Sequence, residues 1–289
     1  MKLTLLRHGI ACTALLMPFI AHSAMPKSEI LLAKPNTEYG LQVSRITEGN
    51  SYNNQPLLTD NGIYFTQEVN ELGQSQTDLA FYSFDDQQTY NLTNSPVSEY
   101  SATLTPKGDA LSAIVVEADG KQKLWQYPLN TELPPSRIFE WIEPVGYHAW
   151  GIDNDLVMFI LGEPHTLQYT KVAAAKGQVV AQNIGRTLMF NASLAAFTFT
   201  YTKNAENWLA SYAPNSQMVT DLFRLADGVQ DYTFKNDNTV IYALNNRIYQ
   251  RSLSAPENVS QWLDLTPYCS AQITRLSYNN EQLAFVCRK

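Results

Sequence analysis

The feature that most constrains this chain is a phrase that recurs about six times along it. In each copy a short strand-forming segment runs into a turn, and a second strand of mostly apolar residues follows. The turns lie near residues 61, 107, 154, 192, 237 and 280, so neighbouring copies are 38 to 47 residues apart. A repeat of this length, with several strands in each unit, is typical of a β-propeller.

The repeat predicts an all-β fold, a six-bladed β-propeller with four-stranded antiparallel blades of about 44 residues each. The second copy shows a whole blade in the sequence. Its turn, Thr105-Pro-Lys-Gly108, contains a proline that restricts φ and a glycine that tolerates positive φ. We expect the four strands of this blade at residues 102–104, 111–117, 122–127 and 137–141.

The chain ends after only two strands of the last copy. Two segments with strand character, residues 30–33 and 41–46, precede the first full copy and belong to no other blade. We therefore expect the N-terminal strands to complete the last blade and close the ring. Closure removes the exposed strand edges that invite aggregation.

The first residues have the composition of a secretory signal. Lys2 and Arg7 precede an apolar stretch over residues 9–21, and small residues follow it at a cleavage point. A membrane anchor is the alternative, but the stretch is short for a span of about 20 residues. We expect a cleaved signal peptide at 1–23 and a single propeller domain at 24–289, located in the bacterial periplasm or secreted.

The charge of the chain argues against two classes of partner. The net charge is −7, and removal of Lys2 and Arg7 leaves 18 basic residues against 27 acidic ones. Nucleic acids and anionic membranes attract clustered Lys and Arg, which this sequence lacks. No second apolar stretch approaches the length of a span, so no integral membrane segment is expected after cleavage of the signal.

Two cysteines remain after the signal, Cys269 and Cys287. An isolated pair in an exported chain predicts a disulfide, here placed in the last blade. Metal ligation is the alternative, but no histidine or further cysteine lies nearby at the spacing of a metal site.

The repeat also resembles a known family. Leu92-Thr93, then Ser98 to Gly108, then Lys123-Leu-Trp125 are similar to the TolB-type six-bladed propeller repeat, "LT…SPxxSPDGxxIAF…LW", and residues 273–285 resemble it again. The resemblance covers most of the chain after the signal and implies the same six-bladed fold. TolB also carries a separate α/β domain ahead of its propeller, and we expect no counterpart of that domain in these 289 residues. The fold by itself names no activity.

Motifs for catalysis are missing. The sequence contains no G-x-S-x-G elbow, no phosphate-binding P-loop, no H-E-x-x-H and no dinucleotide fingerprint. Only His148 and His165 remain as bases once the signal is removed. We expect no cofactor and no metal ion.

The strongest candidate site lies where each repeat enters its inner strand. Inner strands line the central channel of a propeller, so residues at equal offsets should form a ring at one mouth of it. Alternatively, these polar residues only pair with each other and hold the blades together. The residues at these positions are Asn54/Gln55, Glu99/Ser101, His148, Arg186, Asp231 and Arg275. The predicted ring takes Gln55 and Glu99 from the two pairs, together with His148, Arg186, Asp231 and Arg275.

The leading hypothesis is an exported, non-catalytic binding propeller that holds a protein, peptide or glycan of the cell envelope at this mouth. One alternative is a lyase or hydrolase in which His148 acts as the base, with Glu99 or Asp231 as its partner. Another is a structural envelope component without a small ligand. A metal ion among Glu99, His148 and Asp231 would favour the enzyme.

Overall fold

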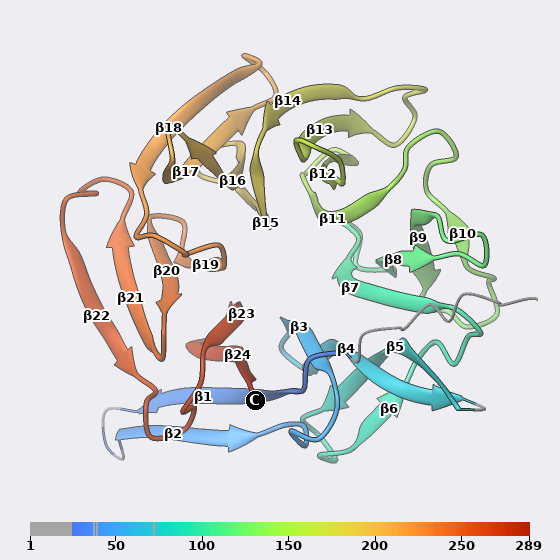
Figure 1. Cartoon of the computed structure of the whole chain (residues 1–289), viewed down its shortest axis with the longest axis horizontal. Coiled ribbons are helices and arrows are strands. Elements are labelled where there is room, and N and C mark those ends of the chain that lie inside the picture. The colour runs from blue at the N-terminus through green and yellow to red at the C-terminus, as the bar shows by residue number, and fades with distance from the viewer. Residues whose placement is uncertain (1–24, 37, 39, 72) are drawn as a thin grey trace, which may run out of the picture.

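The computed structural model describes residues 25–289 except positions 37, 39 and 72. The predicted signal peptide and its cleavage point lie outside the described residues. The described chain forms six four-stranded antiparallel sheets arranged in a ring (Figure 1). The predicted six-bladed, all-β architecture is therefore confirmed. No helix in the described part of the chain is long and apolar enough to cross a bilayer.

The strands follow the order of the repeats. Blades 1 and 2 contain β3 (Asn53–Leu58), β4 (Gly62–Glu71), β5 (Gln74–Ser83), β6 (Thr89–Asn91), β7 (Ser98–Leu104), β8 (Ala110–Val116), β9 (Gln122–Pro128) and β10 (Ser136–Arg137). Blades 3 and 4 contain β11 (Val145–Trp150), β12 (Asp155–Ile160), β13 (Thr166–Lys171), β14 (Gln178–Gln182), β15 (Ile184–Asn191), β16 (Ala196–Lys203), β17 (Glu206–Ala213) and β18 (Met218–Arg224). Blade 5 contains β19 (Tyr232–Asn236), β20 (Thr239–Leu244), β21 (Arg247–Ser252) and β22 (Val259–Asp264).

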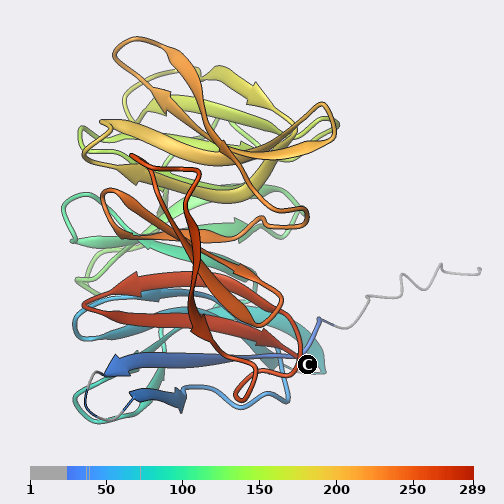
Figure 2. The same cartoon turned by 90° about the vertical axis from the view of Figure 1, so that its left-hand side faces the viewer.

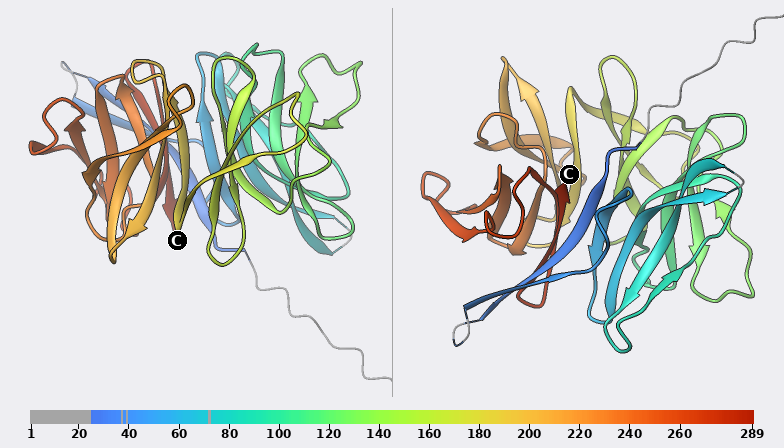
Figure 3. Two further views of the ribbon diagram at one scale, coloured as in Figure 1. Left: turned by 90° about the horizontal axis from the view of Figure 1, so that it is seen from above. Right: turned by 60° about the horizontal axis from the view of Figure 1, so that its bottom comes forward.

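The two ends of the chain share blade 6, which consists of β23 (Ile273–Asn279), β24 (Gln282–Arg288), β1 (Ser28–Asn36) and β2 (Gly40–Arg45). β1 pairs antiparallel with β24, and Ser28 lies opposite Arg288. In Figure 3 the blue N-terminal strands lie next to the red C-terminal ones. The backbone N–H of Lys289 donates to the carbonyl of Lys27 at 3.1 Å, so the C-terminus lies beside the start of β1 (Figure 2). The predicted closure of the ring by the N-terminal strands is confirmed.

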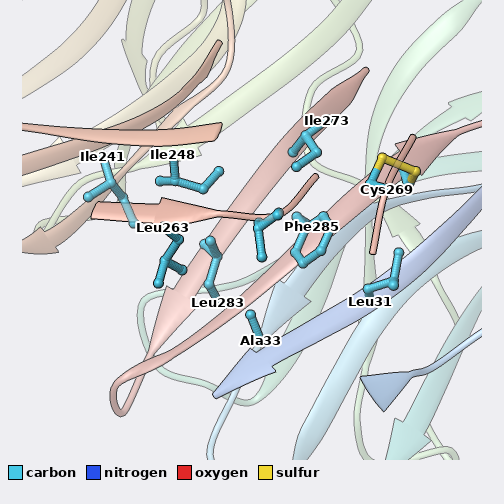
Figure 4. Packing of buried hydrophobic residues seen from close by; sticks show 11 residues of the cluster. Leu31, Ala33, Ile241, Ile248, Leu263, Cys269, Ile273, Leu283 and Phe285 are labelled. Atoms are coloured by element: carbon cyan, nitrogen blue, oxygen red, sulfur yellow. A yellow bond between two sulfur atoms is a disulfide. The ribbon is translucent and has the colours of Figure 1, made fainter. Parts of the chain in front are cut away.

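The core consists of apolar side chains packed between neighbouring blades. The second strands are the most buried, and every residue of β12 is buried, as expected for a strand covered on both faces. Figure 4 shows the packing between blades 5 and 6, where Ile248 and Leu263 lie near Phe285 and Leu31 of the closing blade. Each such side chain stabilises the fold by about 1.5–3 kcal/mol when fully buried, so the closing strands are held by packing as well as by hydrogen bonds.

The outermost strand of blade 2 differs from the prediction. We expected it at residues 137–141, but β10 contains only Ser136 and Arg137. Phe139 and Ile142 turn inward instead and are buried with Val145 in the core between blades 2 and 3. Their burial outweighs continued pairing at the sheet edge, because an edge strand gains little apolar contact on its outer side.

The predicted disulfide is present between Cys269 and Cys287 (Figure 4). Cys287 lies on β24, and Cys269 lies in the connection between β22 and β23. The bond therefore ties the entrance of the last blade to that blade's second strand. Both cysteines are buried in the core cluster of blades 5 and 6.

Candidate functional site: the central channel

The inner strands of all six blades line one cavity of about 360 Å³. These strands are β3, β7, β11, β15, β19 and β23, which surround the centre of the ring in Figure 1. Five residues of the predicted ring line this cavity, namely Gln55, His148, Arg186, Asp231 and Arg275. A smaller cavity of about 190 Å³ adjoins it and is also lined by Arg186 and Asp231.

The inner strands are irregular where they border the channel. The pairing of each one with its second strand shifts register, the mark of a β-bulge. Gln55, Ser101 and Arg275 lie at these irregularities in the left-handed region, with φ of 54°, 60° and 52°. The left-handed conformation is unfavourable in free energy for a residue other than glycine, and residues strained in this way are found most often at functional sites. A bulge also re-aims side chains, so simple alternation along the strand does not predict which ones reach the channel.

Asp231 is the carboxylate of the channel lining, and it is shared by two arginines. Arg186 Nε donates to Asp231 Oδ1 at 2.9 Å, and Arg186 Nη2 donates to Oδ2. Arg275 Nε lies 4.0 Å from Oδ1, beyond hydrogen-bond distance. Burial opposes ionisation of Asp231, but the bonded Arg186 and the charges of both guanidiniums outweigh burial and lower its pKa. Asp231 is therefore ionised and ties blades 4, 5 and 6 together.

Arg275 reaches across the channel to the opposite blade. Its Nη2 donates to the phenol oxygen of Tyr147 at 2.8 Å. Burial raises the pKa of Tyr52, a phenol close to both Arg275 and Tyr147, so Tyr52 stays neutral at physiological pH. Tyr147 and Tyr52 were missed by the sequence analysis, which named neither as a candidate site residue. Tyr147 directly precedes His148 in the sequence, but nothing in the repeat marks it as polar lining.

Gln55 contributes its side chain to the contact between blades 1 and 2. Its Oε1 accepts from Thr66 Oγ1 at 2.8 Å and from the backbone N–H of Ser101 at 3.0 Å. The Gln55 side chain therefore both lines the cavity and satisfies the backbone of the neighbouring inner strand.

His148 is a buried neutral base rather than a charged member of the ring. Its Nε2 lies 2.6 Å from Ser112 Oγ, which also accepts from Trp150 Nε1 at 2.8 Å and donates to the Thr103 carbonyl at 3.0 Å. Because Ser112 has a single proton, this network assigns the proton to Nε2 of His148. Burial lowers the pKa of His148 to about 3.

Glu99 does not join the ring, which corrects the sequence prediction. It is fully buried, and its carboxylate accepts from the hydroxyls of Ser95, Thr93 and Tyr127, the last two at 3.2 and 3.3 Å. It lies at a groove of about 810 Å³ beside blade 2, not at the channel. Glu99 precedes the bulge of β7, and the blade 2 residues that line the channel run from Ser101 to Leu104. Burial raises the pKa of Glu99 to about 7.

In the described part of the chain, His148 makes no hydrogen bond or ion pair with Glu99 or with Asp231, the two partners of the enzyme hypothesis, although Asp231 lines the same cavity. Asp231 is bonded to Arg186, Glu99 lies beside blade 2, and His148 is bonded to Ser112. Across the described residues, no three His, Cys, Asp or Glu side chains are grouped so that they could hold a metal ion.

The fold has many solved counterparts. A putative TolB from Agrobacterium tumefaciens superposes with a TM-score of 0.69 at 12% identity, covering 92% of this chain and 99% of that one. TolB from Acinetobacter baumannii gives a TM-score of 0.56 at 10% identity, covering 91% of this chain and 64% of that one. An oligogalacturonate lyase from Vibrio parahaemolyticus gives 0.54 at 9% identity, covering 90% and 98%. No family model matches the sequence, and no curated protein matches it.

The fold and the channel together define a class. The chain is a six-bladed β-propeller, closed by its N-terminal strands and similar in fold to the TolB structures, with a polar channel that contains a shared carboxylate and two guanidiniums. At these identities the solved structures establish the fold alone.

Proposed function

We propose that this protein is an exported, non-catalytic binding propeller that holds its ligand or partner at one mouth of the central channel. The observation that carries this proposal is the channel cavity, which is lined by polar side chains from several blades and by inner strands with left-handed residues. Concave sites with a few convergent polar groups are the usual places for ligands. The occupant is a protein, peptide or glycan of the cell envelope.

The proposed location outside the cytoplasm rests on two observations. The N-terminal residues have the pattern of a signal peptide, and Cys269 is bonded to Cys287. Disulfides persist in oxidising compartments, which include the bacterial periplasm.

The enzyme alternative has less support from the geometry. A base needs a reachable partner and a pKa near the working pH, whereas His148 has a strongly lowered pKa and no carboxylate beside it. An oligogalacturonate lyase shares the fold, but a shared propeller fold does not transfer an activity.

The proposal is tested by filling the channel. Leu57 lines the cavity, so Leu57→Trp should obstruct it. Val179 is exposed on β14, the outermost strand of blade 3, and Val179→Trp is the matched control. The mature protein and both variants are used as bait in envelope extract, and recovered partners are quantified by mass spectrometry. Wild type and Val179→Trp should recover the same partner, and Leu57→Trp at least tenfold less, with all three similarly folded by circular dichroism.

Two outcomes contradict the proposal. One is equal recovery of the partner by Leu57→Trp, which would place binding elsewhere on the surface. The other is the absence of any partner enriched by the wild-type protein over beads alone.

A further inference from the structure

The charge of the channel cavity is opposite in sign to that of the whole chain. The chain carries a net charge of −7, whereas the cavity lining includes two arginines and one aspartate. His148 is neutral because burial holds its pKa far below its usual range. Arg288 borders the adjoining smaller cavity, where it is exposed to solvent. The channel therefore holds one excess positive charge.

The excess charge belongs to Arg275. Arg186 takes both oxygens of Asp231, and Arg275 approaches the same carboxylate only to 4.0 Å. The Arg275 guanidinium donates a hydrogen bond to Tyr147, a neutral phenol. Among the described residues no carboxylate other than Asp231 lies within 4.0 Å of Arg275, and its side chain is only 13% exposed. Charges this buried are normally paired.

The backbone holds Arg275 in this position. Its φ of 52° is the left-handed conformation of a bulge, and β23 shifts register between Thr274 and Leu276. Gln55 has a φ of 54° at the corresponding place of blade 1, so the fold accepts glutamine in this conformation. The strained backbone at Arg275 thus positions guanidinium donors at the cavity. Backbone strain of this kind is typical of a binding site and not of a residue that only packs in the core.

The charge and the shape of the Arg275 guanidinium indicate which chemical group of a ligand it would bind. A guanidinium is a planar fork that matches a carboxylate with two parallel hydrogen bonds. One excess charge balances a monoanion, whereas a phosphate dianion would need more cations. Tyr147 accepts from Arg275, which leaves its own phenol proton available as a further donor.

We propose that the channel cavity binds a carboxylate group of its ligand through the guanidinium of Arg275. This proposal rests on the proposed binding function of the channel and names the chemistry of its occupant. The carboxylate comes either from an acidic unit of a glycan, for which the small acids of the test stand in, or from the C-terminus of a peptide or protein, and the experiment separates these sources.

The test measures the melting temperature of the mature protein at pH 7.5 and equal ionic strength in sodium chloride, acetate, succinate, sulfate or phosphate. Triglycine and triglycinamide are compared as peptides with and without a terminal carboxylate. The variant is Arg275→Gln, and Arg247→Gln is the control, because Arg247 is half-exposed and pairs with exposed Asp264. A ligand present at about ten times its Kd should raise the melting temperature by about 2–5 °C.

We expect at least one carboxylate probe to give this rise over chloride in wild type and Arg247→Gln, and none in Arg275→Gln. A rise in melting temperature with triglycine but not with acetate or succinate identifies a peptide terminus as the source. A rise with acetate or succinate but not with triglycine identifies a small acid group. The proposal is overturned by an equal rise in Arg275→Gln, by no rise with any carboxylate, or by a rise with sulfate or phosphate alone. Should Arg275→Gln fail to fold, Tyr147→Phe replaces it, and the proposal then requires a carboxylate response several-fold weaker than that of wild type.

The two proposals fail in different ways. If no carboxylate binds but Leu57→Trp still abolishes recovery of the partner, the binding function stands and the carboxylate assignment falls. If a carboxylate binds through Arg275 but Leu57→Trp recovers the partner normally, the channel is not the partner site.

Discussion

Asp231 is the residue on which the charge balance of the channel depends. It is buried, accepts two hydrogen bonds from Arg186 and lies 4.0 Å from Arg275. Removing one member of a buried ion pair leaves the other charge uncompensated, which typically costs 3–5 kcal/mol.

Asp231→Asn should therefore lower the free energy of unfolding by about 3 kcal/mol in urea titrations. The control is Asp227→Asn, because Asp227 is exposed and lies 3.7 Å from an exposed arginine. The control should change stability by less than about 0.5 kcal/mol. Equal stability of Asp231→Asn and wild type would mean that the shared carboxylate does not hold the blades together.

Glu99 gives the protein an unusual pH dependence. Burial raises its pKa from 4.5 to about 7, and nearby Asp78 adds to the rise, while the hydroxyls of Ser95, Thr93 and Tyr127 act against it. The folded state therefore binds more protons than the unfolded state between these values, so stability falls as pH rises from 4.5 to 7 and is constant above. His148, whose pKa is lowered to about 3, acts with the opposite sign and loses stability as pH falls below 6.5.

The difference in unfolding free energy between wild type and Glu99→Gln isolates the Glu99 contribution, because the His148 effect is common to both. Glutamine has no proton to lose, so wild type should lose stability relative to Glu99→Gln as pH rises from 4.5 to 7. Urea titrations at half-unit steps of pH measure this. A difference that stays constant over the window would show that Glu99 ionises as readily in the folded state as in the unfolded one.

At the scale of single elements, the disulfide is a crosslink over a short piece of chain. Cys269 and Cys287 are 18 residues apart in the sequence, and the loop they close contains the connection to β23 and all of that strand. In the chain-entropy account, closing a loop of this size stabilises the folded state by about 3 kcal/mol.

Replacement of both cysteines by alanine should lower the free energy of unfolding by about 3 kcal/mol, measured in urea. Reduction of the wild-type protein should produce a comparable loss, whereas dithiothreitol should leave the double variant unchanged. Free thiols in non-reduced protein purified from the periplasm would contradict the bond itself.

Buried strands were predicted from the sequence more accurately than exposed ones. The second strand of blade 2 was expected at 111–117 and lies at Ala110–Val116, because a run of apolar β-formers covered on both faces has few other conformations. The outermost strand of the same blade was misplaced because Phe139 and Ile142 turn into the core. The outermost strand of a blade is paired on one side only, so its own sequence does not fix where it ends. Tertiary packing determines that position.

At the scale of the whole molecule, the ring is closed without a covalent link. β1 pairs with β24 over residues 28–33, and buried Glu29 pairs with Arg45 at 2.9 Å and with Lys289. The two ends of the chain are thus held in one blade by hydrogen bonds, charge and the apolar cluster of Figure 4. Loss of β1 and β2 would expose a long apolar edge on β24.

The closure predicts the behaviour of a circular permutant. Joining Lys289 to Lys27 through Asn-Gly makes a short hairpin between β24 and β1, and new termini can open the exposed turn at residues 161–165. This permutant should fold cooperatively with a melting temperature within about 5 °C of wild type. Deletion of residues 1–48 should instead give aggregated or unfolded protein. A deletion protein that melts like wild type would show that β1 and β2 are dispensable for the ring.

The sequence by itself determined the number of blades, the closing strands and the disulfide. These follow from local properties that repeat along the chain: turns at a regular spacing, apolar second strands, and a count of cysteines. The tertiary structure decided which polar residues meet in the channel. Bulges shift the register of the inner strands, so Ser101 instead of Glu99 reaches the cavity, and Tyr147 joins Arg275 from the opposite blade. Register and contacts across the ring depend on how six blades pack together, and no short stretch of sequence encodes them.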